Sequence, residues 1–164
     1  MNSPPSILLV DDEIDNFDVI EMLLLPEGYQ LYYASGGAQA LSFLQSTQPD
    51  TILLDVMMPD MDGIEVCQKI RANPLWRHIP IIIVTALNSK TDLARCLEAG
   101  ANDFISKPVN GMELRARIHS MLRIKQQHDD LQSLIQVRED MVNMIVHDLR
   151  NPLATIMLST DILR

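Results

Sequence analysis

The feature that most constrains the fold is a set of five short apolar runs, most of them rich in Ile, Val, Leu or Tyr. They are Ile7–Val10, Gln30–Ala34, Thr51–Leu54, Ile81–Val84 and Asp103–Ser106. Several apolar residues in succession are typical of strands buried on both faces, as in a parallel sheet. Amphipathic stretches at residues 14–25, 37–47, 64–72, 89–99 and from 110 onward alternate with these runs and predict helices. The pattern predicts an α/β fold built on a doubly wound five-stranded parallel sheet.

The C-terminal part of the chain has a different pattern, because no Gly or Pro occurs from Met112 to Asn151. One helix over that segment would span about 60 Å, so we expect it to leave the domain and extend into a coiled coil. Steps of four and three residues form a heptad seam, in which His128 and Arg138 replace apolar residues. The seam consists of Ile124, His128, Leu131, Ile135, Arg138, Val142, Ile145 and Leu149. We expect a homodimer through residues 118–149; the alternative is a helix that folds back on its own domain.

Polar side chains stand where the predicted strands end. Asp11 and Asp12 follow the first strand, Asp55 the third, Thr85 ends the fourth and Lys107 follows the fifth. Because ligands of doubly wound sheets bind at the carboxyl ends of the strands, we expect these side chains to converge. Three carboxylates would repel one another unless a cation neutralised them, and Mg²⁺ prefers such oxygen ligands. A carboxylate beside Mg²⁺ can attack phosphorus, while Lys107 and Thr85 hold the phosphoryl oxygens.

Each of these residues alone has a simpler interpretation. The acids after the first strand could cap a helix, as could Thr85, and Lys107 could be an ordinary surface residue. Asp55 is harder to explain in this way, since an acid at the end of a buried strand needs a partner. Their joint order and spacing favour one phosphoryl-transfer site.

These residues also resemble a known family. The segments Val10-Asp11-Asp12, Leu54-Asp55 through Asp62-Gly63, Val84-Thr85-Ala86 and Lys107-Pro108 are similar to the motifs of the receiver domain of two-component response regulators, over about residues 5–122. The resemblance implies the flavodoxin-like strand order 2-1-3-4-5. It also implies a histidine kinase or phosphotransfer protein as the phosphodonor.

The same resemblance implies roles for individual residues. Asp55 would be the phosphoacceptor, assisted by Lys107, and the Lys107-Pro108 peptide bond would be cis. The Mg²⁺ ligands would be Asp11, Asp12, Asp55 and the main-chain carbonyl of Met57. Thr85 and Phe104 would be the switch residues; Phe104 stands where the family often has Tyr, and its simpler interpretation is a core aromatic.

A second motif lies in the C-terminal helix, His147-Asp148-Leu149-Arg150-Asn151-Pro152. His147 is about 200° around the helix from the seam residue Ile145, so its imidazole should face solvent. Asp148 could orient the ring and accept the proton from its other nitrogen, and Pro152 would bend the helix just past the site. The motif resembles the H-box of sensor histidine kinases, which implies His147 as a phosphoacceptor. The alternative is a chance match within a structural coiled coil.

The two motifs together predict part of a hybrid histidine kinase. We expect a receiver over residues 1–120, a helical coiled-coil linker over 121–137, and the first helix of a histidine kinase dimerisation domain over 138–164. The H-box resemblance covers only the first helix of that domain, so its second helix is expected beyond this segment. The ATP-binding domain is also expected there, because no glycine follows Gly111 to build a nucleotide loop. The alternative is a stand-alone response regulator whose C-terminal helix only dimerises or docks a partner. A phosphatase of the haloacid-dehalogenase type would need an Asp where the chain has Met57.

Composition excludes other classes of function. The chain of 164 residues has 22 Asp and Glu against 13 Lys and Arg, for a net charge of −9, and no basic Lys or Arg precedes Lys69. The acidic surface of residues 1–68 repels phosphate backbones, so we expect no binding of nucleic acid by this part of the chain. Cys67 and Cys96 lie in apolar helical patterns that are typical of reduced core thiols. The start does not resemble a signal peptide and no apolar run has the length of a membrane span, so we expect a cytoplasmic protein.

Overall fold

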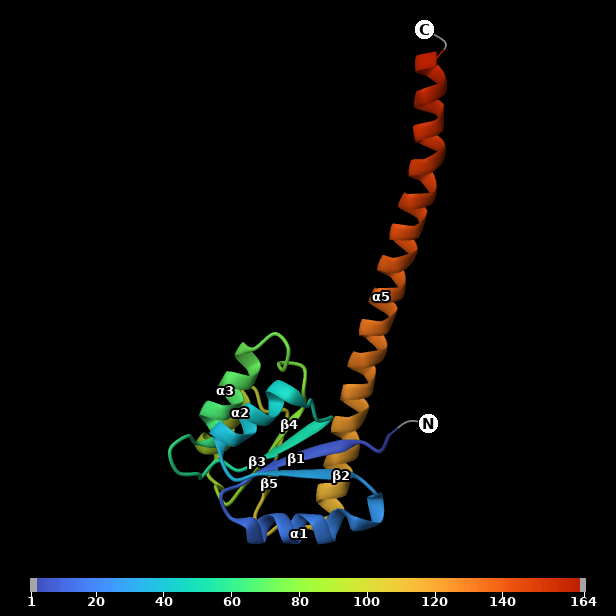
Figure 1. Ribbon diagram of the computed structural model, residues 1–164. Helices are drawn as coiled ribbons and strands as arrows, with labels where there is room; N and C mark the ends of the chain where they lie inside the picture. Colours follow the sequence, from blue (N-terminus) through green and yellow to red (C-terminus); the bar gives the residue numbers. More distant parts are fainter. Residues whose placement is uncertain (1–2, 163–164) are drawn as a thin grey trace. The chain divides into compact units, whose positions relative to one another are not determined.

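The computed structural model describes residues 3–162 and the side chains of residues 3–160 (Figure 1). The chain divides into two compact units, one that ends at Gln126 and one that begins at Gln127. Residues 163 and 164, which end the predicted histidine kinase segment, lie outside the described residues. No helix among the described residues combines the length and the apolar composition of a membrane span.

The first unit contains a five-stranded parallel sheet in the order β2-β1-β3-β4-β5, which confirms the predicted fold class. Its strands are β1 (Ser6–Val10), β2 (Gln30–Ala34), β3 (Thr51–Leu54), β4 (Ile81–Thr85) and β5 (Asp103–Ser106). The register pairs Val10 with Ala34 on one side and with Leu54 on the other. The residues that follow Val10 and Leu54 therefore leave the sheet at the same level.

The connections between strands are helical, as the amphipathic stretches predicted. The helices are α1 (Ile14–Leu24), the short 3-10 helix η1 (Leu25–Glu27), α2 (Gly37–Ser46), α3 (Gly63–Ala72), α4 (Lys90–Glu98) and α5 (Gly111–Ile162). Side chains of Asp62, Ser89 and Asn110 accept hydrogen bonds from backbone amides at the starts of α3, α4 and α5. Ser89 therefore occupies the capping position that one interpretation gave to Thr85.

Two apolar layers cover the sheet, and alternate strand residues belong to different layers. Leu8 and Val10 of β1 pack in a cluster with residues of α2, α3 and α4. Ile7 and Leu9 of the same strand pack in a second cluster with residues of α1 and the start of α5. Figure 1 shows α1 on one side of the sheet and α2 and α3 on the other. This doubly wound arrangement leaves the carboxyl ends of the strands free to carry a site.

The second unit consists of helix α5 from Gln127 onward. Every side chain from residue 131 to residue 160 is exposed, including the seam residues Leu131, Ile135, Val142 and Ile145. The helix continues through Pro152, which lies inside it. The coiled coil and the homodimer through residues 118–149 stay predictions.

Candidate functional site

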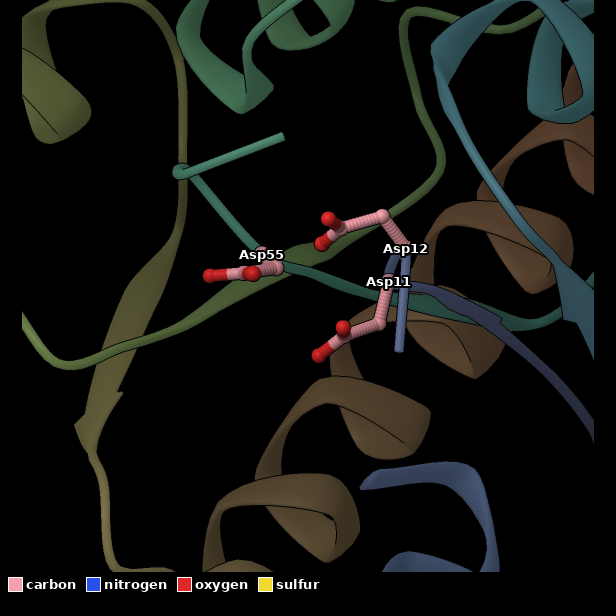
Figure 2. Close-up of side chains that lie close together, drawn as sticks. All are labelled: Asp11, Asp12 and Asp55. Carbon is pink, nitrogen blue, oxygen red and sulfur yellow. The ribbon is translucent and has the colours of Figure 1, made fainter. Parts of the chain in front are cut away.

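Three carboxylates converge at the carboxyl ends of β1 and β3, as the sequence predicted. Asp11, Asp12 and Asp55 each offer an oxygen within 4.8 Å of the others. Figure 2 shows the three side chains gathered around one space. Asp11 and Asp55 are buried, whereas Asp12 is exposed and leaves the group open to solvent. Backbone amides fasten the two buried acids to the sheet, because Asp11 donates to the carbonyl of Ala34 and Asp55 to that of Val10.

Lys107 completes this group from the end of β5. Its Nζ lies 3.1 Å from Asp11 Oδ2 and 3.5 Å from Asp55 Oδ2. Its backbone N–H donates to the carbonyl of Thr85, and the following bond to Pro108 is cis, in agreement with the expectation. Burial alone would lower the pKa of Lys107, but the hydrogen bond that its ammonium donates to Asp11 and the charges of both acids raise it above its ordinary value. Lys107 is therefore a cation at neutral pH.

Asp55 has the opposite electrostatic balance. Burial raises the pKa of its carboxyl above the ordinary value; the charge of Lys107 lowers it, and the charge of Asp11 raises it again. The group thus holds more negative charge than Lys107 can compensate, and a further cation would relieve it.

The loop after β3 is shaped by a close contact. A Cβ at Gly63 would overlap the backbone oxygen of Asp55, so only glycine fits at this start of α3. The N–H of Gly63 donates to the carbonyl of Val56, and the backbone of Met57 donates to the Asp55 carboxylate. The Met57 side chain is exposed, so the contribution expected from Met57 is that of its main-chain carbonyl.

The two predicted switch residues lie on neighbouring strands. Thr85 is fully buried at the end of β4, and its Oγ1 accepts a hydrogen bond from the N–H of Leu87 at 3.1 Å. Phe104 of β5 is partly buried against the cluster that contains α3 and α4. Its backbone N–H donates to the carboxylate of Asp103, which also forms an ion pair of 2.6 Å with Arg117 of α5. The strand that carries Phe104 is thus connected to α5.

Sequence reasoning missed two residues that hold Asp11. The amide of Asn16 donates to both carboxylate oxygens, at 3.1 and 3.0 Å, and the Tyr33 hydroxyl donates to the Asp11 backbone oxygen at 2.8 Å. Asn16 lies five residues after Asp11, in the first turn of α1. Nothing in that spacing distinguishes it from a helix residue that faces solvent. Tyr33 lies beside Tyr32 in β2, and only the packing distinguishes the two.

Comparison with known proteins agrees with this geometry. The family model described as "Response regulator receiver domain" matches residues 7–119. The chain belongs to the response regulator receiver domain family. The first unit is accordingly a receiver domain of two-component signal transduction.

Relatives of this receiver occur in different protein contexts. The chain is 44% identical over 125 residues to the "Response regulator PleD" of Caulobacter vibrioides, a match that covers 76% of this chain and 28% of that protein. It is 37% identical to the receiver domain of a signal transduction histidine kinase from Syntrophus aciditrophicus, with a TM-score of 0.68 over 73% of this chain and 90% of that one. It is 35% identical to the receiver domain of the sensor histidine kinase PA1611 from Pseudomonas aeruginosa PAO1, with a TM-score of 0.68 over 73% of this chain and 98% of that one. The last structure has a magnesium ion coordinated in its active site cleft.

The second predicted motif belongs to the second unit. His147 and Asp148 are both exposed, and His147 Nδ1 lies 3.7 Å from Asp148 Oδ1. The seam residues around His147 are exposed as well, so its orientation relative to a coiled-coil partner stays a prediction. The family match ends at residue 119, so the role of His147 stays a prediction.

Proposed function

We propose that this receiver accepts a phosphoryl group on Asp55 from a phosphohistidine, in a reaction that requires Mg²⁺. The observation that carries the proposal is the convergence of three carboxylates, at the ends of the adjacent strands β1 and β3, beside one ammonium group from the end of β5. The donor set fits Mg²⁺, because it consists of oxygens with excess negative charge and one exposed member. Asp11, Asp12, Asp55 and the main-chain carbonyl of Met57 would hold the ion. When bound, it would neutralise charge on the carboxylates and on the incoming phosphoryl oxygens.

The residues of this chain have distinct parts in the reaction. A carboxylate oxygen of Asp55 forms a bond to phosphorus while the bond between phosphorus and the donor imidazole nitrogen breaks, and the imidazole leaves with the electron pair. Lys107 is close enough to Asp55 to stabilise the phosphoryl oxygens through its charge. The Thr85 oxygen already accepts from Leu87, so its hydroxyl proton remains to be donated to the phosphoryl group.

The test is labelling with a small phosphodonor. With acetyl phosphate and Mg²⁺, the chain should gain one phosphoryl group that is lost in base, as acyl phosphates are, and Asp55→Asn should abolish it. Asp18→Asn is a matched control, since Asp18 is an exposed acid of α1. Persistent acyl phosphate in the Asp55 variant would overturn the assignment.

We further propose that residues 138–164 are the first helix of a histidine kinase dimerisation domain, with His147 as its phosphoacceptor and Asp148 as the acid that orients it. The receiver at 1–120 and the linker at 121–137 would then precede a kinase core in a hybrid histidine kinase. The H-box resemblance supports this, as does the occurrence of similar receivers in two histidine kinases.

This proposal is tested by adding ATP with and without the ATP-binding core of a histidine kinase. ATP alone should leave the chain unlabelled, and the added core should place an acid-labile phosphoryl group on it. His147→Gln should remove this label, whereas His119→Gln, which changes a histidine of the receiver, should keep it. Self-labelling with ATP alone, or an unaffected His147→Gln variant, would contradict the assignment.

We propose a homodimer through residues 118–149, which the exposed seam of α5 supports. An isolated helix leaves Leu131, Ile135, Val142 and Ile145 in water, and a coiled coil would bury them. Replacing Ile135 and Ile145 by Glu should convert a dimer to a monomer in sedimentation equilibrium. Glu at Ser133 and Gln136, on the face away from the seam, should not. A monomeric wild-type chain would refute the dimer.

Phosphorylation of Asp55 would act on the kinase through this helix pair. Phe104 lies in the strand that the ion pair of Asp103 with Arg117 connects to α5, so movement at Thr85 and Phe104 reaches the base of the helix. Spin labels at Gln132 and Asn143 should change their inter-subunit distances when a phosphoryl mimic is bound. Distances unchanged at both positions would refute the mechanism and leave the receiver assignment intact.

A second candidate function is a stand-alone response regulator whose C-terminal helix only dimerises or docks a partner. The similarity to a protein described as a response regulator, PleD, rather than as a histidine kinase favours it. In this case His147→Gln would leave every phosphorylation assay unchanged.

A further inference from the structure

The turn that carries Asp11 and Asp12 is fastened to the edge strand β2. The Tyr33 hydroxyl donates to the backbone oxygen of Asp11 at 2.8 Å. One peptide earlier, the N–H of Asp11 donates to the backbone oxygen of Ala34 at 3.1 Å. Both peptide groups of Asp11 are therefore attached to β2, one through the main chain and one through a phenol.

The ring of Tyr33 is itself held in place. It packs against Phe17 of α1, with ring centroids 5.3 Å apart and an interplanar angle of 52°. The phenol thus lies between the edge strand and the first turns of the helix that follows the acidic turn. A tyrosine has only two side-chain torsions, so packing of the ring leaves the hydroxyl little freedom.

Asp12 depends on this attachment more than the other two acids do. The Asp11 carboxylate is held by Asn16, by the N–H of Glu13 and by Lys107. Asp12 is exposed, and its position follows from the main chain before it. Because the peptide between Asp11 and Asp12 is planar, fixing the Asp11 carbonyl oxygen also fixes the N–H and the Cα of Asp12.

We propose that Tyr33 is a positioning residue of the Mg²⁺ site, which orients Asp12 through the peptide that joins it to Asp11. This inference rests on the proposed function, in which the three carboxylates bind Mg²⁺. It adds to the site a residue of β2, a strand that supplies none of the proposed ligands.

The experiment compares Mg²⁺ binding by the wild-type chain, Tyr33→Phe and Tyr32→Phe, using isothermal titration calorimetry on the full chain. Tyr32 is the matched control, since its ring packs against Phe43 at 4.9 Å in the cluster on the α2 and α3 side. A net hydrogen-bond contribution of about 1 kcal/mol corresponds to about a fivefold change in affinity. We expect Tyr33→Phe to weaken Mg²⁺ binding by about 3-fold to 10-fold. Tyr32→Phe should stay within about twofold.

A double-mutant cycle with Asp12→Asn separates positioning from a general loss of stability. If Tyr33 acts through Asp12, adding Tyr33→Phe to Asp12→Asn should weaken Mg²⁺ binding no further. Additive losses would overturn the inference, as would equal Mg²⁺ affinities for Tyr33→Phe and Tyr32→Phe when the wild-type chain binds Mg²⁺. A wild-type chain that binds no Mg²⁺ would overturn the proposed function together with the inference. Metal-free melting of each variant verifies that the compared chains are folded.

Discussion

Replacing Lys107 by Met is expected to destabilise the metal-free receiver, because it removes the cation from a group of three carboxylates. Three negative charges and one positive charge give a net charge of −2, which the substitution changes to −3. Asp11 and Asp55 are buried and would then face each other without their shared partner. Methionine is likewise unbranched and only one atom shorter, so the change is mainly electrostatic.

The size of the effect follows from the geometry and the exposure of Lys107. At an effective dielectric constant of about 20, a cation 3.5 Å from a carboxylate oxygen attracts it by about 5 kcal/mol. The cost of desolvating the ammonium offsets a large part of that attraction. Removing one partner of a fully buried pair costs about 3–5 kcal/mol, and the 23% exposure of the Lys107 side chain places this case near the lower limit. We expect a loss of about 2–3 kcal/mol, or about 6–10 °C in the melting temperature of a domain of this size.

The loss should depend on pH in a defined direction. Without Lys107, the pKa of Asp55, already raised by burial, rises further because the lowering effect of the cation is gone. A carboxyl whose pKa is raised in the folded state binds a proton more tightly there than in the unfolded state, so stability increases as the pH falls through the raised pKa. The difference between Lys107→Met and the wild-type chain should therefore shrink from about pH 7.5 to about pH 5.

Urea unfolding in the presence of a chelator measures this at both pH values. The control is Lys69→Met, since Lys69 is half-exposed and lies 3.8 Å from Glu65 one helical turn away. It should cost no more than about 0.5 kcal/mol. Equal unfolding midpoints for the two variants at neutral pH, or a gap that widens in acid, would refute the electrostatic argument.

Three further predictions concern the same unit, each measured by urea unfolding without divalent ions. Asp55→Asn should raise the urea midpoint at neutral pH, because burial raises the pKa of Asp55 against the lowering effect of Lys107. This gain in stability should vanish as the pH falls through that pKa, and a lower midpoint at neutral pH would contradict the prediction. Gly63→Ala should cost about 3 kcal/mol, since its Cβ would overlap a backbone oxygen, whereas Gly36→Ala has open space and should cost less than about 1 kcal/mol. Arg71→Met should cost about 2–4 kcal/mol, because the guanidinium donates to two carbonyls and one amide oxygen at 2.8 to 2.9 Å; an effect below 1 kcal/mol (about the value of one hydrogen bond) would show that these bonds contribute little.

Much of the fold was predictable because each strand has a local signature. The short runs rich in apolar residues place β2, β3 and β5 at their observed bounds, and β1 and β4 within one residue. The acids and Lys107 were found from a rule of topology, since the carboxyl ends of parallel strands meet.

The residues that support the site were not predictable in the same way. Tyr32 and Tyr33 are neighbours of the same type, and alternation along a strand says only that they face opposite sides. Which of them meets Asp11 depends on the position of α1, a contact between elements that are separated in sequence. Arg71 resembles an exposed basic residue in the last turn of α3, yet it reaches the carbonyls of Ile79 and Gly100. These roles arise from contacts between elements that are distant in sequence, and the hydrophobic periodicity of the sequence does not predict such contacts.

The parallel sheet separates where this domain can vary from where it cannot. Every group of the acidic site follows the carboxyl end of a strand, namely β1, β3 or β5. The segments that enter β3 and β5, at residues 47–50 and 99–102, lie at the amino ends of the strands, because all five strands run in the same direction. Insertions in these segments would lengthen the chain and leave the three acids at the same spacing. Related receivers can therefore diverge in outline at one end of the sheet while the other end keeps a constant arrangement of charge.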